Sequence, residues 1–508
     1  MIGDYLWIVI TGGITSFIAS MGIGANDVGN AFASSIGSKA LTVKNAVVIA
    51  SIFECAGAIL MGSHVTKTIR KGIADYECFE DSPEIFIYVC FCVLTSVAAW
   101  LFLASYLEMP VSTTHSCVGG MIGMTLVTGG SNCVIWYEET ESFPWVGGVS
   151  GIIISWFLSP IFSAIVAGSI FYSTRLLVLR KENSFNKSYW SFPIFVSLTM
   201  TLNTFFIIYK GGKGVGLDDI PMGAALLIAS CIGLFSGGII IPLIPHMKNK
   251  INQRIDNDNE YDLRVIENNE NNPINQKEKK GINKAISKIK DNMNYDMELI
   301  KVENIKDIHD NCEVFDKKTE ESFKYLQIFT AICDSFSHGA NDVANAIGPY
   351  AAIVSIYMND GEMSKKVEMD EYAYIILAMG GLGISLGLIL YGYKIIRAIG
   401  VKLCCITPSR GFSIELGSAT IIIIGSRLGI PLSTTHCQVG ATMGVGALED
   451  FKGCSGINWI IAYKVFLGWI ITLLVVGGTT ALLTAQGIYS PSEIKGQCLL
   501  VNHTNSSL

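Results

Sequence analysis

Two stretches of the chain carry nearly the same eight residues, Gly24-Ala-Asn-Asp-Val-Gly-Asn-Ala31 and Gly339-Ala-Asn-Asp-Val-Ala-Asn-Ala346. A second pair follows in the same order, with Pro110-Val-Ser-Thr-Thr-His115 returning as Pro431-Leu-Ser-Thr-Thr-His436. Chance does not easily produce two distinct motifs, in one order, in both halves of a chain. The sequence therefore predicts an internal duplication that places both motifs at equivalent points of its two halves.

Charge is distributed very unevenly around these motifs. Half of the 508 residues are hydrophobic and 16% are charged, against roughly a quarter charged in an average soluble domain. Residues 246–324 alone hold 15 Lys/Arg and 17 Asp/Glu. The charge-poor remainder excludes a soluble globular protein and a nucleic-acid binder, and the net charge of −7 argues against a polybasic partner surface. The composition predicts a polytopic membrane protein, held in a lipid bilayer, with one polar insert.

Twelve apolar segments qualify as candidate membrane spans, since about 20 apolar residues cross roughly 30 Å of hydrocarbon. Two of them are short and rich in Gly and Thr, so re-entrant hairpins or broken helices are the alternative for these two. The predicted fold class is an all-α polytopic membrane protein with about twelve transmembrane helices. The segments are Tyr5–Ile23, Asn45–Ser63, Glu84–Leu107, Val111–Val127 (short), Trp145–Tyr172, Phe192–Tyr209, Met222–Pro245, Tyr325–Tyr357 (with a break), Tyr372–Ile396, Phe412–Leu428, Leu432–Leu448 (short) and Ile457–Ala485.

This pattern divides the chain into four parts: an N-terminal membrane half (1–245), the polar insert (246–324), a C-terminal membrane half (325–490) and a polar tail (491–508). The insert buries too little apolar surface to offset the entropy of ordering, so we expect it to be mostly disordered. One stretch within it, Ile282–Ile300, has apolar residues at helical spacing and is interpreted as a surface or solvated helix.

The orientation in the membrane is weakly determined by Lys and Arg, which the two sets of connections share almost equally. The Cys133–Phe143 connection is acidic and has no Lys or Arg, and the tail carries glycosylation sequons at Asn502 and Asn505. Both features favour extracellular termini and a cytoplasmic insert. Cys78, Cys133 and Cys498 fall in polar connections that can share one side, where a disulfide between two of them is an option.

The two copies of the first motif fall in the first and the eighth candidate span. The two copies are thus seven spans apart, and an odd number of spans reverses the orientation of the second copy across the membrane. This predicts an inverted-topology repeat of the kind common in secondary transporters. If the segment that begins at Val111 is re-entrant and does not cross the membrane, the number of crossings between the two copies changes by one. The second copy would then not be inverted, unless another segment is re-entrant as well.

The first motif predicts a cation site. A Gly followed by Ala-Asn-Asp at membrane depth interrupts a helix and frees backbone groups, which is tolerated only against protein or a water-filled cavity. The Asn and Asp side chains of one copy lie within about one helical turn and can converge. Oxygen-rich clusters with a single negative charge suit a hard monovalent cation, whereas capping of a broken helix is the alternative. The candidate ligands are Asn26, Asp27 and Asn30 in the first copy and Asn341, Asp342 and Asn345 in the second.

The second motif predicts an anion site. Pro is favoured at helix starts, so each copy directs backbone N–H groups and hydroxyls toward one spot, where the positive end of the helix dipole favours anions. Two such starts from inverted halves would meet near the midplane and surround a tetrahedral oxyanion. Ordinary capping and helix packing is the alternative. The six hydroxyls are those of Ser112, Thr113, Thr114, Ser433, Thr434 and Thr435.

Four further ionisable residues lie at membrane depth. Glu54 and Glu415 have no acidic partner at the equivalent position of the other half. Carboxylates at such depths are costly, so Glu54 and Glu415 are interpreted as functional and are counted among the candidate sodium ligands. Asp334 and His338 precede the second copy of the first motif, where the first copy has apolar residues.

With these motifs the chain resembles the inorganic phosphate transporter (PiT) family of sodium– or proton–phosphate symporters. The paired GANDVxNA segments are that family's signature, and the P-[VL]-S-T-T-H segments and Thr407–Leu416 also resemble it. The resemblance covers residues 1–245 and 325–490. It implies twelve spans with an inverted repeat, a long cytoplasmic central loop, extracellular termini and a homodimer.

The resemblance also implies roles for individual residues. Asp27 and Asp342, with their neighbouring Asn residues, would bind the cation and contribute to the phosphate site. Glu54 and Glu415 match acidic positions that the family associates with transport.

The predicted function is a symporter, without a cofactor, that couples inward sodium movement to phosphate uptake, in the plasma membrane. Sodium is favoured over protons because the GAND motifs supply oxygen ligands and no duplicated His. Three alternatives are a proton-coupled transporter, a transporter of another oxyanion, and a phosphate-sensing receptor. An enzyme is disfavoured because a hydrolase needs an oriented base beside its nucleophile.

Overall fold

The computed structural model describes residues 2–140, 145–209, 220–268, 312–363, 372–392, 403–449, 456–490, 493–494 and 497–498. These residues fold into a helical bundle with two small sheets, β1 (Glu138–Glu139) with β2 (Val146–Gly147) and β3 (Glu493–Ile494) with β4 (Gln497–Cys498). The helices are α1 (Leu6–Asn26), α2 (Val28–Ala31), α3 (Ala33–Gly37), α4 (Val43–Lys71), α5 (Pro83–Tyr106), α6 (Thr113–Thr128), α7 (Gly148–Thr174), α8 (Ser184–Ile208), α9 (Met222–Asn268), α12 (Lys317–Met358), α13 (Tyr372–Gly387), α15 (Pro408–Arg427), α16 (Thr434–Gly446) and α17 (Trp459–Tyr489), with short 3-10 or π turns η1 (Ile2–Tyr5), η2 (Tyr76–Phe79), η3 (Ser131–Cys133), η4 (Arg175–Leu179) and η7 (Leu388–Gly392).

Each of the twelve predicted segments forms a helix, but only some of these helices qualify as membrane spans. Within the described residues, eight helices are long and apolar enough to cross a bilayer: α1, α4, α5, α7 with η4, α8, α9, α13 with η7, and α17. The other four segments form α6, α12, α15 and α16. Of these, α6 has 16 residues and α16 has 13, which at about 1.5 Å per residue is less than the roughly 30 Å of a hydrocarbon core.

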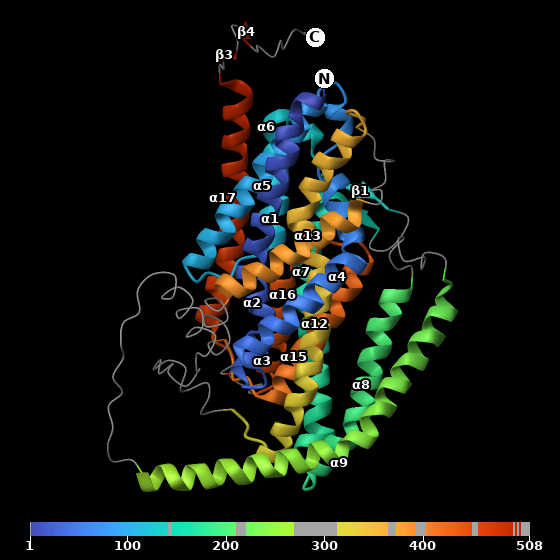
Figure 1. The fold of residues 1–508 in the computed structure, drawn as a ribbon, viewed down its shortest axis with the longest axis vertical. Helices are drawn as coiled ribbons and strands as arrows, with labels where there is room; N and C mark the ends of the chain where they lie inside the picture. The colour runs from blue at the N-terminus through green and yellow to red at the C-terminus, as the bar shows by residue number, and fades with distance from the viewer. Residues whose placement is uncertain are drawn as a thin grey trace.

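The chain ends and the insert lie at opposite ends of the elongated bundle. Figure 1 shows the start of α1 and the end of α17 at one end, hereafter the terminal end, and shows the end of α9 and the start of α12 at the other, hereafter the insert end. Helix α1 runs from the terminal end toward the insert end, whereas α12 runs in the opposite direction (Figure 1). The two helices that carry the first motif are therefore antiparallel.

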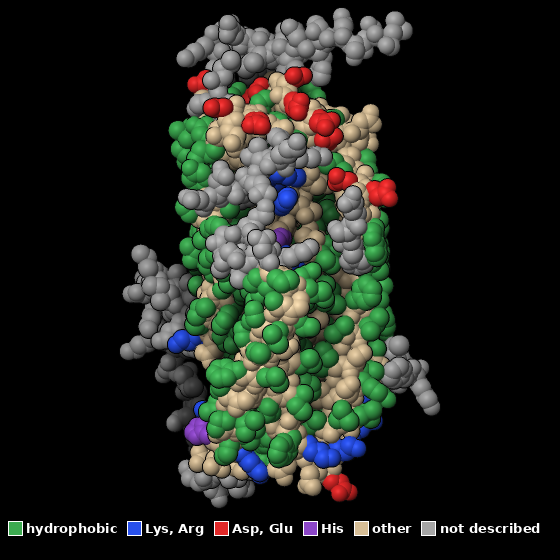
Figure 2. Space-filling view, turned by 90° about the vertical axis from the view of Figure 1, so that its right-hand side faces the viewer, with side chains coloured by type: hydrophobic (Ala, Val, Ile, Leu, Met, Phe, Trp, Pro, Cys, Tyr) green, Lys and Arg blue, Asp and Glu red, His purple; other side chains and the backbone are tan. Residues whose placement is uncertain are grey.

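The surface is sorted by polarity along the same axis. Figure 2 shows most acidic side chains gathered at the terminal end, Lys and Arg side chains both just below them and at the insert end, and a broad hydrophobic belt over the lower and middle part of the bundle. Large hydrophobic side chains are exposed along α1, α7, α8, α9 and α17. Such an apolar belt fits contact with lipid tails.

Helix α12 is unbroken over its 42 residues, so the predicted break within Tyr325–Tyr357 is wrong. The first copy of the motif does interrupt its helix, because α1 ends at Asn26 and α2 begins at Val28. The two copies differ at one position after the Asp, where the first has Gly29 and the second Ala344. Alanine favours the helix by about 1 kcal/mol over glycine, and this difference agrees with a continuous second copy.

The leading glycine of each motif allows a close approach of two helices. A Cβ on Gly24 would lie 1.8 Å from the carbonyl oxygen of Ile384 in α13, and a Cβ on Gly339 would lie 2.1 Å from that of Glu54 in α4. Both contacts join backbone to backbone, and no side chain can move to relieve them. Each motif therefore packs against a helix of the other half of the chain.

At the terminal end a disulfide joins Cys78 to Cys133, which confirms the option seen in the sequence. It links η2, between α4 and α5, to η3, between α6 and α7. An isolated β-bridge between Ala74 and Val134 lies next to it. The connections at this end are thus fixed to one another.

At the insert end an ionic cluster attaches the residues before α12 to η4, to α15 and to the residues that follow η4 and α16. The carboxylate of Glu313 accepts two hydrogen bonds of 2.8 Å from Arg180, and these bonds hold the pKa of Glu313 below its ordinary value. Arg410 in α15 donates to the backbone carbonyl of Glu313 (2.8 Å) and to the carboxylate of Glu449 (2.8 Å). Arg175, from η4 after α7, lies 3.7 Å from Glu313.

The predicted insert is partly helical at its borders. Helix α9 continues to Asn268 and α12 begins at Lys317. The rest of the insert, including the predicted helix at Ile282–Ile300, and the two sequons of the tail lie outside the described residues.

Candidate functional site

Asp27 lies at the interruption that the first motif was predicted to make. Its side chain is 1% exposed. Its Oδ2 accepts a hydrogen bond from Thr113 (2.8 Å), and its Oδ1 accepts one from Thr435. One carboxylate therefore binds hydroxyls from the Ser-Thr-Thr motifs of both halves.

Asp342 lies inside α12 and is fully buried. Its Oδ2 accepts a hydrogen bond from Thr434 (2.7 Å) and approaches Thr113 (3.4 Å). Thr434 holds the same place in the second motif as Thr113 in the first, so its bond to Asp342 repeats the bond of Thr113 to Asp27. The two halves thus build equivalent carboxylate–hydroxyl pairs.

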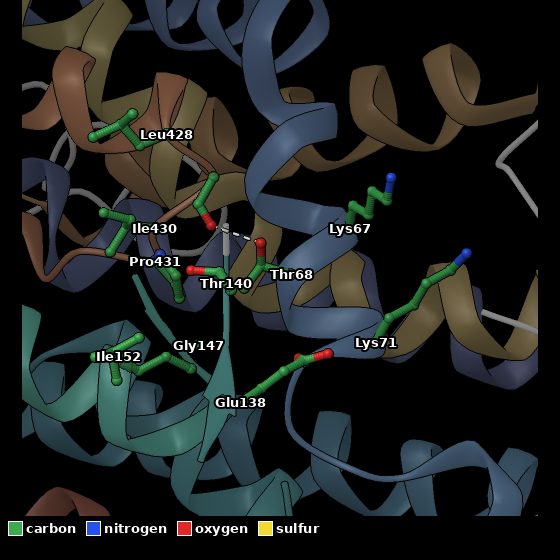
Figure 3. Close-up of a pocket in the computed structure, with 15 residues that line it drawn as sticks. Lys67, Thr68, Lys71, Glu138, Thr140, Gly147, Ile152, Leu428, Ile430 and Pro431 are labelled. Atoms are coloured by element: carbon green, nitrogen blue, oxygen red, sulfur yellow. Dashed lines mark hydrogen bonds between the residues drawn. The ribbon is translucent and has the colours of Figure 1, made fainter. Parts of the chain in front are cut away.

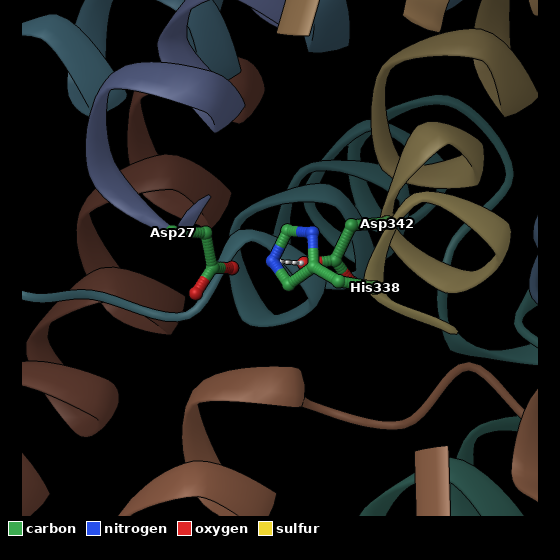
Figure 4. A group of neighbouring side chains, drawn as sticks. All are labelled: Asp27, His338 and Asp342. Atoms are coloured by element: carbon green, nitrogen blue, oxygen red, sulfur yellow. Dashed lines mark ion pairs between the residues drawn. The ribbon is translucent and has the colours of Figure 1, made fainter. Parts of the chain in front are cut away.

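His338 joins this pair to a third carboxylate. Its Nε2 lies 3.1 Å from Oδ2 of Asp342, and its Nδ1 lies 2.9 Å from Oε2 of Glu54. Both ring nitrogens face carboxylate oxygens, so an imidazolium at this position would pair with both carboxylates. Ligand atoms of Asp27, His338 and Asp342 all lie within 4.8 Å of one another, and Figure 4 shows the three side chains converging from α1 and α12.

The two Ser-Thr-Thr motifs form helix starts that meet, as the sequence predicted. Helix α6 begins at Thr113 and α16 at Thr434. The caps Ser112 and Ser433 accept hydrogen bonds from the backbone N–H of the His three residues later and lie 2.8 Å from each other. The hydroxyl of Thr114 donates to the carbonyl of Leu432 (2.8 Å). All six candidate hydroxyl residues are buried.

The asparagines of the first motif divide into two roles. Asn26 donates to the carbonyl of Met109 (2.9 Å) and accepts from the N–H of Val111 (2.9 Å), so it fixes the connection before α6. Asn341 contacts Ser426 and the connection before α16 in either orientation of its amide group. These two side chains position the second motif.

Asn345 instead faces the carboxylates. Its amide nitrogen donates to Thr113 (3.0 Å), lies 3.2 Å from Thr114 and approaches Asp342 (3.4 Å). Its Oδ1 is buried and has no hydrogen-bond partner among the described residues, which leaves an oxygen ligand available. For Asn30, whose backbone lies in α2, the side chain is outside the described part of the structure.

Glu415 lies apart from the central pair and toward the insert end of α15. It accepts four hydrogen bonds, from Ser34 (2.7 Å), Ser35 (2.5 Å), Gln327 (3.1 Å) and Thr330 (2.9 Å). Two of these donors belong to α3, directly after the first motif. The carboxylate of Glu415 is therefore surrounded by donors, while Glu54 reaches the central pair only through His338.

Four residues near the site were not among the predicted ligands. His338 and Asp334 were noted in the sequence only as neighbours of the second motif, and Ser418 and Gln438 were not noted. All four line a narrow packing gap beside Asp27. A polar stripe at helical spacing along α12 is the sequence signal that would have found the first two.

A larger cavity of about 320 Å³ lies toward the terminal end (Figure 3). Lys67 and Lys71 of α4 line it opposite the β1–β2 hairpin, which contributes Glu138. The connection between α15 and α16 is part of its wall, and Thr68 donates to the carbonyl of Gly429 there (2.6 Å). This connection leads directly to Ser433 of the buried site.

The described helices form a polytopic bundle, and its buried centre brings paired carboxylates next to two hydroxyl-rich helix starts. This combination defines an ion-coupled membrane transporter. The chain belongs to the phosphate transporter family, whose family model matches residues 23–480. The predicted family, and the prediction of a transporter in place of an enzyme, are confirmed by this match.

The relatives share nearly the full length of the chain. It is 32% identical to a putative phosphate permease of Haemophilus influenzae, over 92% of this chain and 93% of that protein. It is 29% identical to a sodium-dependent phosphate transporter of Plasmodium falciparum, over 97% of this chain and 98% of that protein. A solved structure of a sodium-dependent phosphate transporter matches with a TM-score of 0.72 and 30% identity, over 94% of this chain and 98% of that one.

Proposed function

We propose that this protein is a symporter that couples inward movement of sodium to the uptake of inorganic phosphate. The observation that carries the proposal is the meeting of Asp27 and Asp342 with the hydroxyls of both Ser-Thr-Thr motifs at one buried point. Carboxylates bind cations, and the hydroxyls and free amides of helix starts bind oxyanions. One site therefore offers ligands to both solutes.

Sodium is assigned to the oxygens on the carboxylate side of the site. Asp27, Asp342 and the unpartnered Oδ1 of Asn345 supply oxygen ligands there, which are the ligands that hard cations take. Asn26, Asn341, Glu54 and Glu415, also predicted as sodium ligands, support these oxygens through the contacts described above. Asn30, whose side chain lies outside the described residues, stays a predicted sodium ligand. Phosphate is assigned to the starts of α6 and α16, with the hydroxyls of Ser112, Thr113, Thr114, Ser433, Thr434 and Thr435.

Electrostatics explains why the two solutes would move together. Two carboxylates and a phosphate monoanion place three negative charges in a site without bulk water. A like-charge pair about 4 Å apart costs roughly 4 kcal/mol at an effective dielectric near 20. Two sodium ions reduce the sum to one negative charge and bridge the anions. Phosphate binding then depends on sodium binding, and by linkage the converse also holds.

An inverted repeat within about twelve spans is part of the proposal. It is supported by the antiparallel directions of α1 and α12 in Figure 1. It is also supported by the equivalent contacts that the two halves make, such as those of Gly24 and Gly339. Helices α6 and α16, too short to cross a bilayer, fit segments that reach only to the middle, as in other transporters with inverted repeats. The division into membrane halves at 1–245 and 325–490 follows from this repeat.

The proposed orientation places the terminal end outside the cell and the insert in the cytoplasm. Disulfides such as that between Cys78 and Cys133 form in oxidising compartments. Arg175, Arg180 and Arg410 lie at the insert end, as the positive-inside rule expects of a cytoplasmic face. The proposal also includes a location in the plasma membrane. A homodimer, which the family resemblance implies, completes it.

Proton coupling is the second candidate, and one observation favours it. His338 lies between Glu54 and Asp342 and is able to exchange a proton with either carboxylate. The asymmetry of this arrangement argues for a supporting role, since the first motif has Ile23 at the equivalent position.

Uptake of labelled phosphate at fixed pH, with sodium replaced by choline, separates the two candidates. We expect uptake to be lost in choline and restored by sodium, because choline is too large to enter a site between two carboxylates. The control is a pH gradient imposed in choline medium. Uptake driven by that gradient without sodium would overturn sodium coupling in favour of protons.

A further inference from the structure

Four aromatic rings stack beside the starts of α6 and α16, and the proposed site uses none of these side chains. The ring of His115 stacks on Trp156 of α7 with 3.7 Å between the ring centroids, and the ring of His436 stacks on Trp469 of α17 at 3.5 Å. The two His rings lie 4.8 Å apart, and all four side chains are buried. Such ring contacts stabilise a defined geometry, so each imidazole is held in place from one side by a tryptophan.

The stack has the same construction in both halves of the chain. Each histidine ends a Ser-Thr-Thr-His motif, and each tryptophan lies in the helix that follows the helix of that motif. Four residues after each histidine, a glycine lies against the backbone carbonyl found four residues after the tryptophan of the other half. These contacts are Gly119 against Leu473 and Gly440 against Pro160. The four rings are therefore a repeated feature of two equivalent halves.

The hydrogen bonds of the two histidines differ in spite of this equivalence. Nδ1 of His115 lies 2.7 Å from Oγ of Ser112. Nδ1 of His436 lies 2.9 Å from the backbone carbonyl oxygen of Trp156. A carbonyl oxygen only accepts, so the Nδ1 of His436 carries a proton. Of the two rings, therefore, only that of His115 is hydrogen-bonded to a cap serine in the described part of the chain.

Ser112 extends the contact of His115 to the second motif. Its Oγ lies 2.8 Å from Oγ of Ser433, so His115, Ser112 and Ser433 form a chain of hydrogen bonds. The Nδ1 of an imidazole either donates or accepts, and this choice sets the direction of the chain. If Nδ1 donates, Ser112 donates to Ser433, and the hydroxyl proton of Ser433 is left for a ligand. If Nδ1 accepts, both hydroxyl protons point back toward His115, and Ser433 offers a ligand only lone pairs.

We propose that His115 is a positioning residue for phosphate. Its protonated Nδ1 starts a hydrogen-bond chain through Ser112 that ends in the hydroxyl proton of Ser433, and this proton is donated to the oxyanion. Hydrogen bonds in a chain polarise one another, which strengthens the last donor. His115 acts through Ser112, without touching phosphate. This role rests on the proposed phosphate site at the starts of α6 and α16 and adds the group that orients its donors.

Equilibrium binding of labelled phosphate to the purified full-length protein, in saturating sodium, tests this role with His115→Phe. Phenylalanine keeps a ring against Trp156 but has no Nδ1. We expect the Kd for phosphate to rise about tenfold, equivalent to about 1.4 kcal/mol. His115→Asn places an amide N–H donor near the position of Nδ1 and should recover most of this loss.

Three further measurements separate positioning from a structural role of the stack. Binding of ²²Na⁺ without phosphate should be unchanged in His115→Phe, because the proposed sodium ligands do not depend on this ring. His436→Phe keeps a ring against Trp469 and loses a bond to a backbone carbonyl, so it should raise the phosphate Kd less than His115→Phe does. His246→Phe, at an exposed histidine of α9, is the matched control and should bind both solutes as the unmodified protein does.

The outcomes keep this role distinct from the proposed function. An unchanged phosphate Kd for His115→Phe would overturn it. Equal losses for His115→Phe and His436→Phe, or a parallel loss of sodium binding, would assign the stack a structural role, which also overturns it. Absence of sodium-dependent phosphate binding by the unmodified protein would instead contradict the proposed function. If His115→Phe does not fold, NMR spectra of ¹⁵N-labelled histidine in the unmodified protein decide. An unprotonated Nδ1 at His115, assigned by its missing signal in His115→Asn, would then overturn the role.

Discussion

Asp27→Asn and Asp342→Asn each abolish sodium-dependent phosphate uptake while the protein still folds and reaches the membrane. Each substitution keeps the size of the side chain but removes one of the two negative charges at the centre. The hydroxyls of Thr113, Thr434 and Thr435 then face an amide, and sodium loses a charged ligand. Because phosphate binding depends on bound sodium in this account, both solutes are lost together.

Labelled phosphate uptake in cells that express each variant, normalised to surface protein, measures the effect. The exposed substitution Asp81→Asn is the matched control and should transport normally. Normal uptake by both central variants would exclude the carboxylate pair from transport. Loss in one variant only would contradict the equivalence of the two halves.

Arg410→Gln has the largest expected effect on stability. The guanidinium is 1% exposed and donates to Glu449, to the hydroxyl of Thr407 (3.0 Å) and to the backbone of Glu313. Removing one partner of a buried ion pair leaves the other charge uncompensated, which costs about 3–5 kcal/mol. Three attachments at the insert end are lost with it.

Thermal unfolding of the detergent-purified variants, followed by loss of the monodisperse species, measures this cost. Arg180→Gln is the control, since Arg180 is 47% exposed where it pairs with Glu313 and exposed pairs contribute about 0.2–1 kcal/mol. The midpoint should fall clearly for Arg410→Gln and little for Arg180→Gln. Equal shifts for the two variants would show that the cluster does not depend on the buried pair.

The sequence predicted the positions of the helices and of both motifs well, for physical reasons. Apolar segments of sufficient length are visible without knowledge of their neighbours. The Pro-x-Ser-Thr-Thr segments start helices because Ser112 and Ser433 cap them locally. The duplication then indicated that the two starts belong together, and the structure brings them within hydrogen-bond distance.

The break predicted in the second motif was wrong because a glycine has two uses. Gly24 and Gly339 were both interpreted as helix breakers. Each serves instead to let two backbones approach, and only the first copy, with Gly29 after its Asp, also interrupts the helix. Local sequence does not show which neighbour a glycine will face.

The partners of the isolated carboxylates were equally hidden. Glu54 meets His338, and Glu415 meets Ser34 and Ser35, across more than 280 residues of chain. Such contacts depend on how the two halves pack and not on spacing within either half. Sequence reasoning therefore identified which charges are unusual, and the fold shows which of them share a site.

Equilibrium binding of labelled phosphate to the purified protein, in sodium and in choline at the same pH and ionic strength, tests the central claim most directly. The carboxylate pair predicts that sodium raises the affinity for phosphate by about 5–150-fold, the range of a coupling free energy of about 1–3 kcal/mol. It also predicts that Asp342→Asn removes this dependence. Equal affinity in sodium and choline would contradict the account, because phosphate would then bind without the cations that the two carboxylates are proposed to hold.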